Sequence, residues 1–184
     1  MRLKSIIIFL VLITAMSANA QKYLTKTGHI KFFSDGQLEK IEAHNRQVNS
    51  ILNTATGDFV FKVLMKSFEF EKALMQEHFN ENYVESDKFP SATFVGKVTN
   101  IKDLNLAKDG VYEANTEGKL TMHGITKDIK EKGTFEVKQG KLIGKAKFNI
   151  AVADFNITIP GNVGKNISKT IEVTVDITLD KATL

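Results

Sequence analysis

The stretch TIEVTVDITL, residues 170–179, decides the fold class because apolar and polar side chains alternate along it without interruption. Ile171, Val173, Val175, Ile177 and Leu179 fall on one face, and Thr and acidic residues fall on the other. Successive side chains of a strand point to opposite faces of the sheet, so this period of two predicts a strand with one buried face.

The same alternation recurs in earlier segments that Gly, Asn and Asp separate. Three of them are clear: DFVFKVLM (58–65), TFVGKVTNI (93–101) and KLIGKAKFNI (141–150). Weaker strands are expected at HIKFFS (29–34), 41–52, 111–124, ITKDIKEKGTFEVK (125–138) and DFNITIP (154–160). Eight or nine strands predict an all-β fold, either an antiparallel barrel of about eight strands or a sandwich.

A single segment, EKALMQEHFNENY (71–83), has helical rather than strand periodicity. Met75, Phe79 and Tyr83 are four residues apart, and Phe70 and Leu74 extend the same apolar side. We therefore predict one short α-helix near residues 70–82, which could lie across the open end of a barrel.

The N-terminus has the pattern of a cleavable export signal. Arg2 and Lys4 precede the apolar run IIIFLVLITAM (6–16), and Ala18-Asn19-Ala20 is a typical cleavage site. The run is too short for a comfortable membrane span, which needs roughly 20 residues. The expectation is a signal peptide over 1–20, one domain over 21–184, and a periplasmic or secreted protein without a stable membrane span.

Composition excludes several function classes. The chain has no cysteine, which rules out disulfides and thiolate metal sites. Without Arg2 and Lys4 there are 23 basic and 21 acidic residues, scattered along the chain, so no nucleic-acid partner is expected.

No motif for catalysis, a metal or a cofactor is evident. His78 lies beside Glu77 and Glu81, but a zinc site needs three or four ligands and the other histidines are on separate segments. There is no nucleophile elbow, His-Glu-x-x-His motif or phosphate-binding loop. We therefore expect no catalytic residues, no metal and no cofactor, and a binding protein rather than an enzyme.

The apolar content of the inferred inner faces is the most informative remaining feature. The chain has 13 phenylalanines and no tryptophan, and small residues such as Gly96, Gly118 and Ala146 share the same faces. A barrel of about eight strands is wide enough either to be filled by its own side chains or to hold a ligand. The pattern by itself leaves both alternatives open.

Three segments resemble one known family. MKSFEFEKALMQEHFNENYVESDKFPSATFVGKV (65–98) resembles the central signature of the YceI-like lipid and polyisoprenoid-binding proteins. GKLTMHGITKDI (118–129) is similar to the hairpin motif of that family, and AVADFNITIP (151–160) with the final strand resembles its C-terminal region. The resemblance extends from about Gly28 to Leu179.

The resemblance implies a lipocalin-like periplasmic or secreted barrel that binds a polyisoprenoid, quinone or fatty-acid-like ligand without catalysis. Carried onto this chain, the pocket lining would be Phe59, Phe61, Val63, Phe94, Val98, Tyr112, Leu120, Met122 and Phe148. The ligand headgroup is expected at the barrel mouth near lysines. His123, Thr126 and Lys127 could contact that headgroup or fix the hairpin, and we favour the structural role.

Three alternatives stay open at this point. The barrel could be a secreted structural or stress-related protein with a filled core and no ligand. It could also be a lipid-modifying enzyme, which would need an inward His or a carboxylate pair. Several Phe positions could equally form the seam of a homodimer.

Overall fold

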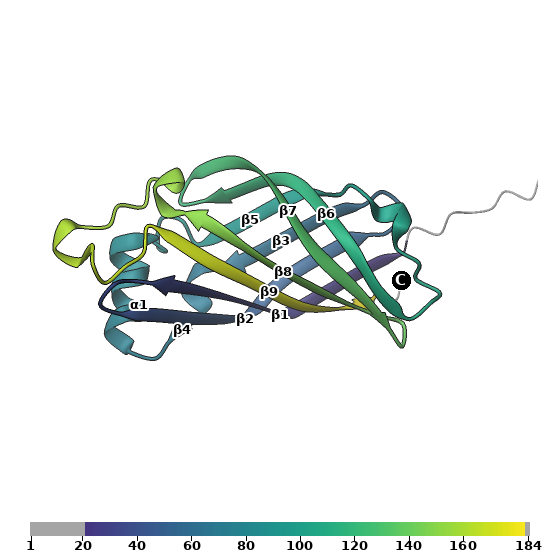
Figure 1. Cartoon of the computed structure of the whole chain (residues 1–184), viewed down its shortest axis with the longest axis horizontal. Helices are drawn as coiled ribbons and strands as arrows, with labels where there is room; N and C mark the ends of the chain where they lie inside the picture. The colour runs from purple at the N-terminus through teal and green to yellow at the C-terminus, as the bar shows by residue number, and fades with distance from the viewer. Residues whose placement is uncertain (1–20, 183–184) are drawn as a thin grey trace, which may run out of the picture.

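The computed structural model describes residues 21–182, so the predicted signal peptide lies outside the described residues. Eight long antiparallel strands form a closed barrel, because β9 pairs with β1 and β1 also pairs with β2 (Figure 1). The strands are β1 (Lys22–Asp35), β2 (Lys40–Asn53), β3 (Asp58–Leu64), β5 (Ser91–Val98), β6 (Gly110–Met122), β7 (Ile125–Lys138), β8 (Lys141–Ala151) and β9 (Thr170–Lys181). The all-β fold predicted from the alternation is confirmed, and of the two architectures that the alternation left open the chain forms the barrel that the family resemblance implied.

The stretch TIEVTVDITL is the body of β9, between β1 and β8. Its apolar face points into the barrel, where Ile177 and Leu179 are 1% and 0% exposed. Leu179 lies opposite Leu142 of β8, and Val173 lies opposite Phe148. The period-two pattern therefore identified the inward face correctly.

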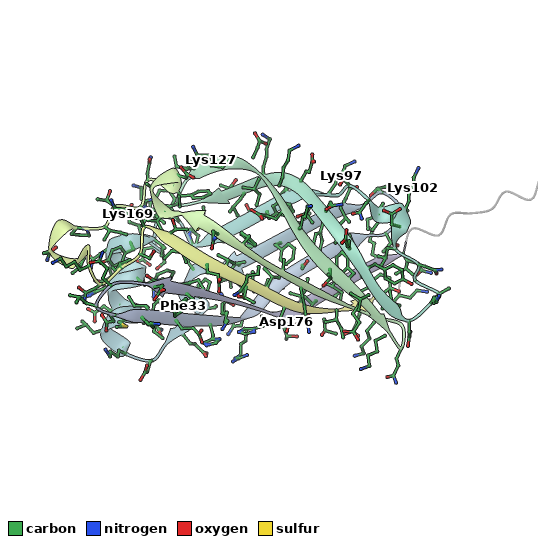
Figure 2. All side chains as sticks on the ribbon, in the orientation of Figure 1. Phe33, Lys97, Lys102, Lys127, Lys169 and Asp176 are labelled. Carbon is green, nitrogen blue, oxygen red and sulfur yellow. The ribbon has the colours of Figure 1, made fainter. Side chains whose placement is uncertain are left out.

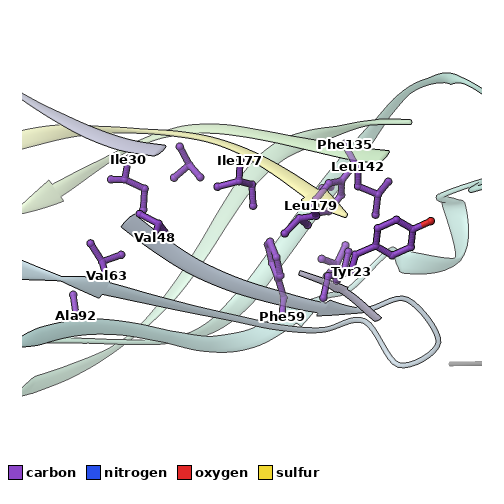
Figure 3. Packing of buried hydrophobic residues seen from close by; sticks show 14 of the residues in the cluster. Tyr23, Ile30, Val48, Phe59, Val63, Ala92, Phe135, Leu142, Ile177 and Leu179 are labelled. Atoms are coloured by element: carbon purple, nitrogen blue, oxygen red, sulfur yellow. The ribbon is translucent and has the colours of Figure 1, made fainter. Parts of the chain in front are cut away.

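The two ends of the barrel differ in how they are closed. At one end, which we call the closed end, side chains of several strands meet in a tightly packed cluster that includes Tyr23, Phe135, Leu142 and Leu179 (Figure 3). Leu52, which lies opposite Tyr23, belongs to the same cluster. The other end, which we call the mouth, carries α1 and the turn between β1 and β2 (Figure 1). Charged side chains such as Lys97 and Lys127 point outward from the wall (Figure 2).

The helical segment is inserted between β3 and β5, at the mouth. The short strand β4 (Phe68–Phe70) pairs with β2, then α1 (Ala73–His78) continues into a π-helical segment, η2 (Phe79–Tyr83). The predicted short helix is confirmed. Leu74, expected on its packed side, is instead 60% exposed.

Residues 154–160 are not the strand that the sequence predicted. The chain forms a 3₁₀ turn, η4 (Val152–Phe155), and Asn156 has a left-handed φ of 57°. Phe155 and Ile157 are both buried, which produces the strand-like alternation without a strand. The remaining 3₁₀ turns are η1 (Met65–Ser67), η3 (Ile101–Asp103) and η5 (Gly161–Val163).

The wall of the barrel is interrupted between β7 and β8. Pairing of these strands begins at Lys138 and Lys141 and ends at Gly133 and Ala146. Beyond that point toward the mouth, β7 pairs with β6 and β8 pairs with β9. The ladder between these two strands therefore ends before the half of the barrel next to the mouth.

Candidate functional site

An apolar cavity of about 370 Å³ occupies the barrel between the closed end and the mouth. Side chains from all eight barrel strands line it, with Phe59 and Phe135 toward the closed end. At the mouth it reaches Met75 and Phe79 of the helical segment and Ile167 of the loop before β9.

Most of the residues predicted to line a pocket do line this cavity. They are Phe59, Phe61, Val63, Phe94, Leu120, Met122 and Phe148. Val98 is 3% exposed and belongs to the packed core, and Tyr112 packs against that core with its hydroxyl donating to the Lys108 carbonyl. Neither is part of the lining. Contact of any of these nine residues with a ligand stays a prediction.

Aromatic rings from β3 and β5 line one side of the cavity. The ring centroids of Phe59 and Phe61 are 4.6 Å apart, and those of Phe61 and Phe94 are 6.4 Å apart. Phe94 packs over Gly96 and Gly118, where a Cβ atom on Gly118 would lie 2.9 Å from its ring. The two glycines thus make room for this ring rather than for a ligand.

A second aromatic cluster surrounds the mouth. Phe79 of η2 contacts Phe32, Phe68 and Phe70, with ring centroids 5.1–5.6 Å apart. Sequence reasoning missed Phe32 because Phe33 beside it left the register open. It missed Phe68 because β4 is only three residues long, and it placed Phe70 on the apolar side of the helix, whereas Phe70 is the last residue of β4.

Few polar side chains line the cavity, and those at the mouth are mostly satisfied. Glu39 accepts hydrogen bonds from Lys72 (2.9 Å) and Asn166 (3.4 Å), which hold its pKa below the usual range. His78 also lies at the mouth. Among residues 21–182 there is no group of three His, Asp or Glu side chains that could hold a metal ion.

Glu131 is the exception, an acidic side chain on the inward face of β7. It shares this face with Phe135 and Val137, and it lies opposite Thr116 of β6. Burial raises the pKa of its carboxyl group, with no opposing partner. Sequence reasoning missed Glu131 because the charged residues of KDIKEKG fall on both faces of the strand. Phe135 and Val137 could have identified it, because they lie an even number of residues further along β7 and therefore share its face.

His123 has a structural role at the β6–β7 turn. One ring nitrogen lies 2.9 Å from the Phe155 carbonyl, and the other lies 2.8 Å from a Glu85 carboxylate oxygen. Its backbone has a left-handed φ of 49°, and its ring contacts Phe89. These contacts join the turn to two other segments, in agreement with the role favoured from the sequence.

None of the described helices is long and apolar enough to cross a membrane. This finding concerns residues 21–182 alone.

Comparisons with known proteins agree with this architecture. The model of the YceI-like domain family matches residues 15–179. A search of curated protein sequences found no match.

Solved structures share the fold at low sequence identity. A polyisoprenoid binding domain from Saccharophagus degradans, implicated in plant cell wall breakdown, is 14% identical with a TM-score of 0.77, covering 89% of this chain and 99% of that one. BcnA from Burkholderia cenocepacia is 14% identical with a TM-score of 0.66, covering 85% and 96%. The YceI protein of Campylobacter jejuni is 16% identical with a TM-score of 0.56, covering 77% and 85%.

The family match covers most of the chain, and the solved structures share its fold. The chain is a member of the YceI-like domain family.

Proposed function

We propose that this protein binds a long-chain apolar or amphiphilic molecule, such as a polyisoprenoid, quinone or fatty-acid-like lipid, inside its barrel. The observation that carries the proposal is the continuous apolar cavity of about 370 Å³. Burial of a chain in such a space gains about 0.8 kcal/mol for each methylene removed from water. Tight binding therefore needs no strong polar anchor.

The cavity favours binding over the two alternatives. A structural barrel with a filled core needs no continuous apolar space between Phe59 and Phe79. An enzyme acting on a lipid would need an inward His or a carboxylate pair. His78 lines the cavity only at the mouth, and the inward carboxyl groups of Glu39 and Glu131 have no hydrogen bond to each other or to His78 within residues 21–182. We therefore propose carriage or sequestration without catalysis.

A displacement titration tests the proposal. The full-length protein is delipidated, loaded with a fluorescent fatty acid and titrated with an isoprenoid alcohol. Ala146→Phe places a ring into the cavity from β8 and is expected to weaken binding at least about tenfold, a loss of about 1.4 kcal/mol. Val95→Phe adds the same ring to the outer wall, where Val95 is 59% exposed, and is expected to bind normally. No saturable binding by the wild-type protein would contradict the proposal.

We also propose that the chain is exported and cleaved after Ala20, because residues 1–20 have the pattern of a signal peptide. N-terminal sequencing of the protein recovered from the producing cells tests this. The expected first residue is Gln21, and an intact Met1 in the exported fraction would contradict it.

A further inference from the structure

Glu131 lies at mid-height inside the barrel, two residues beyond the last β7–β8 pair, Gly133 and Ala146. Its neighbours on the inward face of β7 are Ile129 and Gly133, and all three line the cavity. A carboxyl group thus faces a mostly apolar space at the level where the pairing of β7 with β8 ends, and the hydroxyl group of Thr116 opposite it donates to the Glu131 backbone carbonyl oxygen.

Two other acidic residues of the same hairpin have partners on the outer face. Asp128 pairs with Lys119 at 3.0 Å, and Glu117 pairs with Lys130 at 3.1 Å, all four on the outer face. The Glu131 carboxyl group has no hydrogen bond or ion pair with any residue that the structure describes, and burial is the sole influence on its pKa. The lysines beside it in sequence, Lys130 and Lys132, are both exposed.

An unpaired carboxyl group in an apolar space carries a desolvation cost unless something hydrogen-bonds to it. Here the space beside it is the proposed ligand cavity, so a ligand that displaces water from this space has to supply the hydrogen bond itself. A carboxyl group accepts a hydrogen bond from a hydroxyl group when ionised and donates one to a carbonyl oxygen when protonated. A phosphate in the same place would be repelled by the ionised form.

We propose that Glu131 binds the polar group of the cargo inside the barrel, and that this group is an uncharged hydroxyl or carbonyl rather than a phosphate. The inference rests on the proposed lipid-binding function and names the chemistry of the headgroup. It places the headgroup at mid-height in the barrel, whereas the sequence predicted a headgroup at the mouth near lysines.

The lysines closest to this level are on the outer side of the wall. A shallow outer hollow shares Gly133, Lys145 and Ala146 with the cavity, and Lys132 and Lys147 line its rim. Lys147 is already paired with Glu172 at 2.8 Å. A phosphate held by Lys145 is therefore the rival arrangement that an experiment must distinguish.

Three probes with one isoprenoid chain separate these arrangements: geranylgeraniol, geranylgeranyl phosphate and the corresponding hydrocarbon. Each is titrated into the delipidated full-length protein and into Glu131→Leu, Glu131→Gln and Glu136→Gln. Glu136 lies on the same strand but on its other face, where it is paired with the exposed Val111 of β6. It therefore serves as the matched control.

The wild-type protein is expected to bind the alcohol about tenfold more tightly than the hydrocarbon, and more tightly than the phosphate. Glu131→Leu is expected to lose the preference for the alcohol while it still binds the hydrocarbon, which also shows that the variant is folded. Glu131→Gln should keep most of the alcohol affinity, because an amide also donates and accepts hydrogen bonds, and should gain affinity for the phosphate. Glu136→Gln should match the wild type.

Three results would overturn the inference. These are a wild-type preference for the phosphate, equal binding of the alcohol and the hydrocarbon, and a Glu131→Leu variant that keeps the alcohol preference. If no probe binds the wild-type protein at all, the proposed function itself fails, and that result is distinct from the three above.

Discussion

Alternate side chains point inward in both halves of this barrel, but they fill the interior in one half and line a cavity in the other. At the closed end, Leu52, Leu142 and Leu179 are each 0% exposed and fill the interior. Toward the mouth, Phe94 and Phe148 occupy equivalent inward positions but are only partly buried, because they border the cavity.

The difference comes from the strands around these residues, not from their hydrophobicity. At the closed end β7 and β8 are paired, and their inward side chains meet across the narrow interior. Toward the mouth the pairing of these strands has ended, and β4 with α1 is inserted between β3 and β5. An alternating sequence therefore specifies which side chains point inward, and strand spacing decides whether they fill the space or line it.

The largest expected contrast is in stability. Leu142→Ala removes a fully buried side chain at the closed end and is expected to lower the free energy of unfolding by about 2–5 kcal/mol. Phe148→Ala enlarges an existing cavity, so we expect a smaller loss despite the larger deletion. Urea denaturation of ligand-free protein measures both, and a Phe148→Ala loss as large as that of Leu142→Ala would contradict the comparison.

The mouth cluster should affect both stability and ligand release. Phe79→Ala removes ring contacts with Phe32, Phe68 and Phe70, and we expect a loss of about 1–2 kcal/mol with faster dissociation of a bound chain. Leu74→Ala is the control on α1, because Leu74 is 60% exposed. Stopped-flow displacement measures the release rate; equal rates for the two variants would show that the cluster does not restrict the mouth.

Glu131, in the cavity half, should make the stability of the folded protein depend on pH. Burial raises its pKa in the folded protein above the ordinary value of 4.5, so the folded state binds the proton more tightly. Stability is then lost as pH rises from the ordinary pKa through the raised one. Glu131→Gln should remove this loss and be more stable than the wild type near neutral pH, by about 1 kcal/mol or less. Thermal unfolding at acidic and neutral pH measures it, and a constant difference between the two proteins would contradict the assignment.

The smallest expected effect lies on the outer wall, away from the cavity. Burial, and then the nearby Arg46 and His44, lower the pKa of His29, whose ring lies 3.0 Å from that of His44. The unfolded state therefore takes up the proton more readily, and stability falls as pH drops through the ordinary value of 6.5. His29→Gln should reduce this fall by less than about 1 kcal/mol, measured by denaturation at several pH values, with ligand affinity unchanged. A steeper loss of stability with falling pH in the variant than in the wild type would contradict this assignment.

The sequence predicted most of the fold because alternation is a local property. The segment 170–179 is enough to identify β9 and its inward face, and the spacing of Met75, Phe79 and Tyr83 is enough to predict the mouth helix. The pattern failed at residues 154–160, where a turn with left-handed Asn156 buries Phe155 and Ile157 and imitates a strand.

The candidate site was only partly predictable, because its shape depends on non-local spacing. Seven of the nine predicted residues line the cavity, but no local pattern shows that Val98 lies in the packed core. Whether Gly96 leaves space for a ligand or for Phe94 depends on rings packed across strands. Glu131 was hidden for a related reason, since its inward direction follows from a register that the charged segment around it does not reveal.

Native mass spectrometry of the protein purified from cells that express the whole sequence tests the central claim most directly. We predict a reproducible adduct that solvent extraction identifies as a long-chain apolar or amphiphilic lipid, present in the wild type and Val95→Phe and absent from Ala146→Phe. A ligand-free mass for the wild type, with no uptake of added isoprenoids or fatty acids, would contradict the account and favour a barrel that binds nothing.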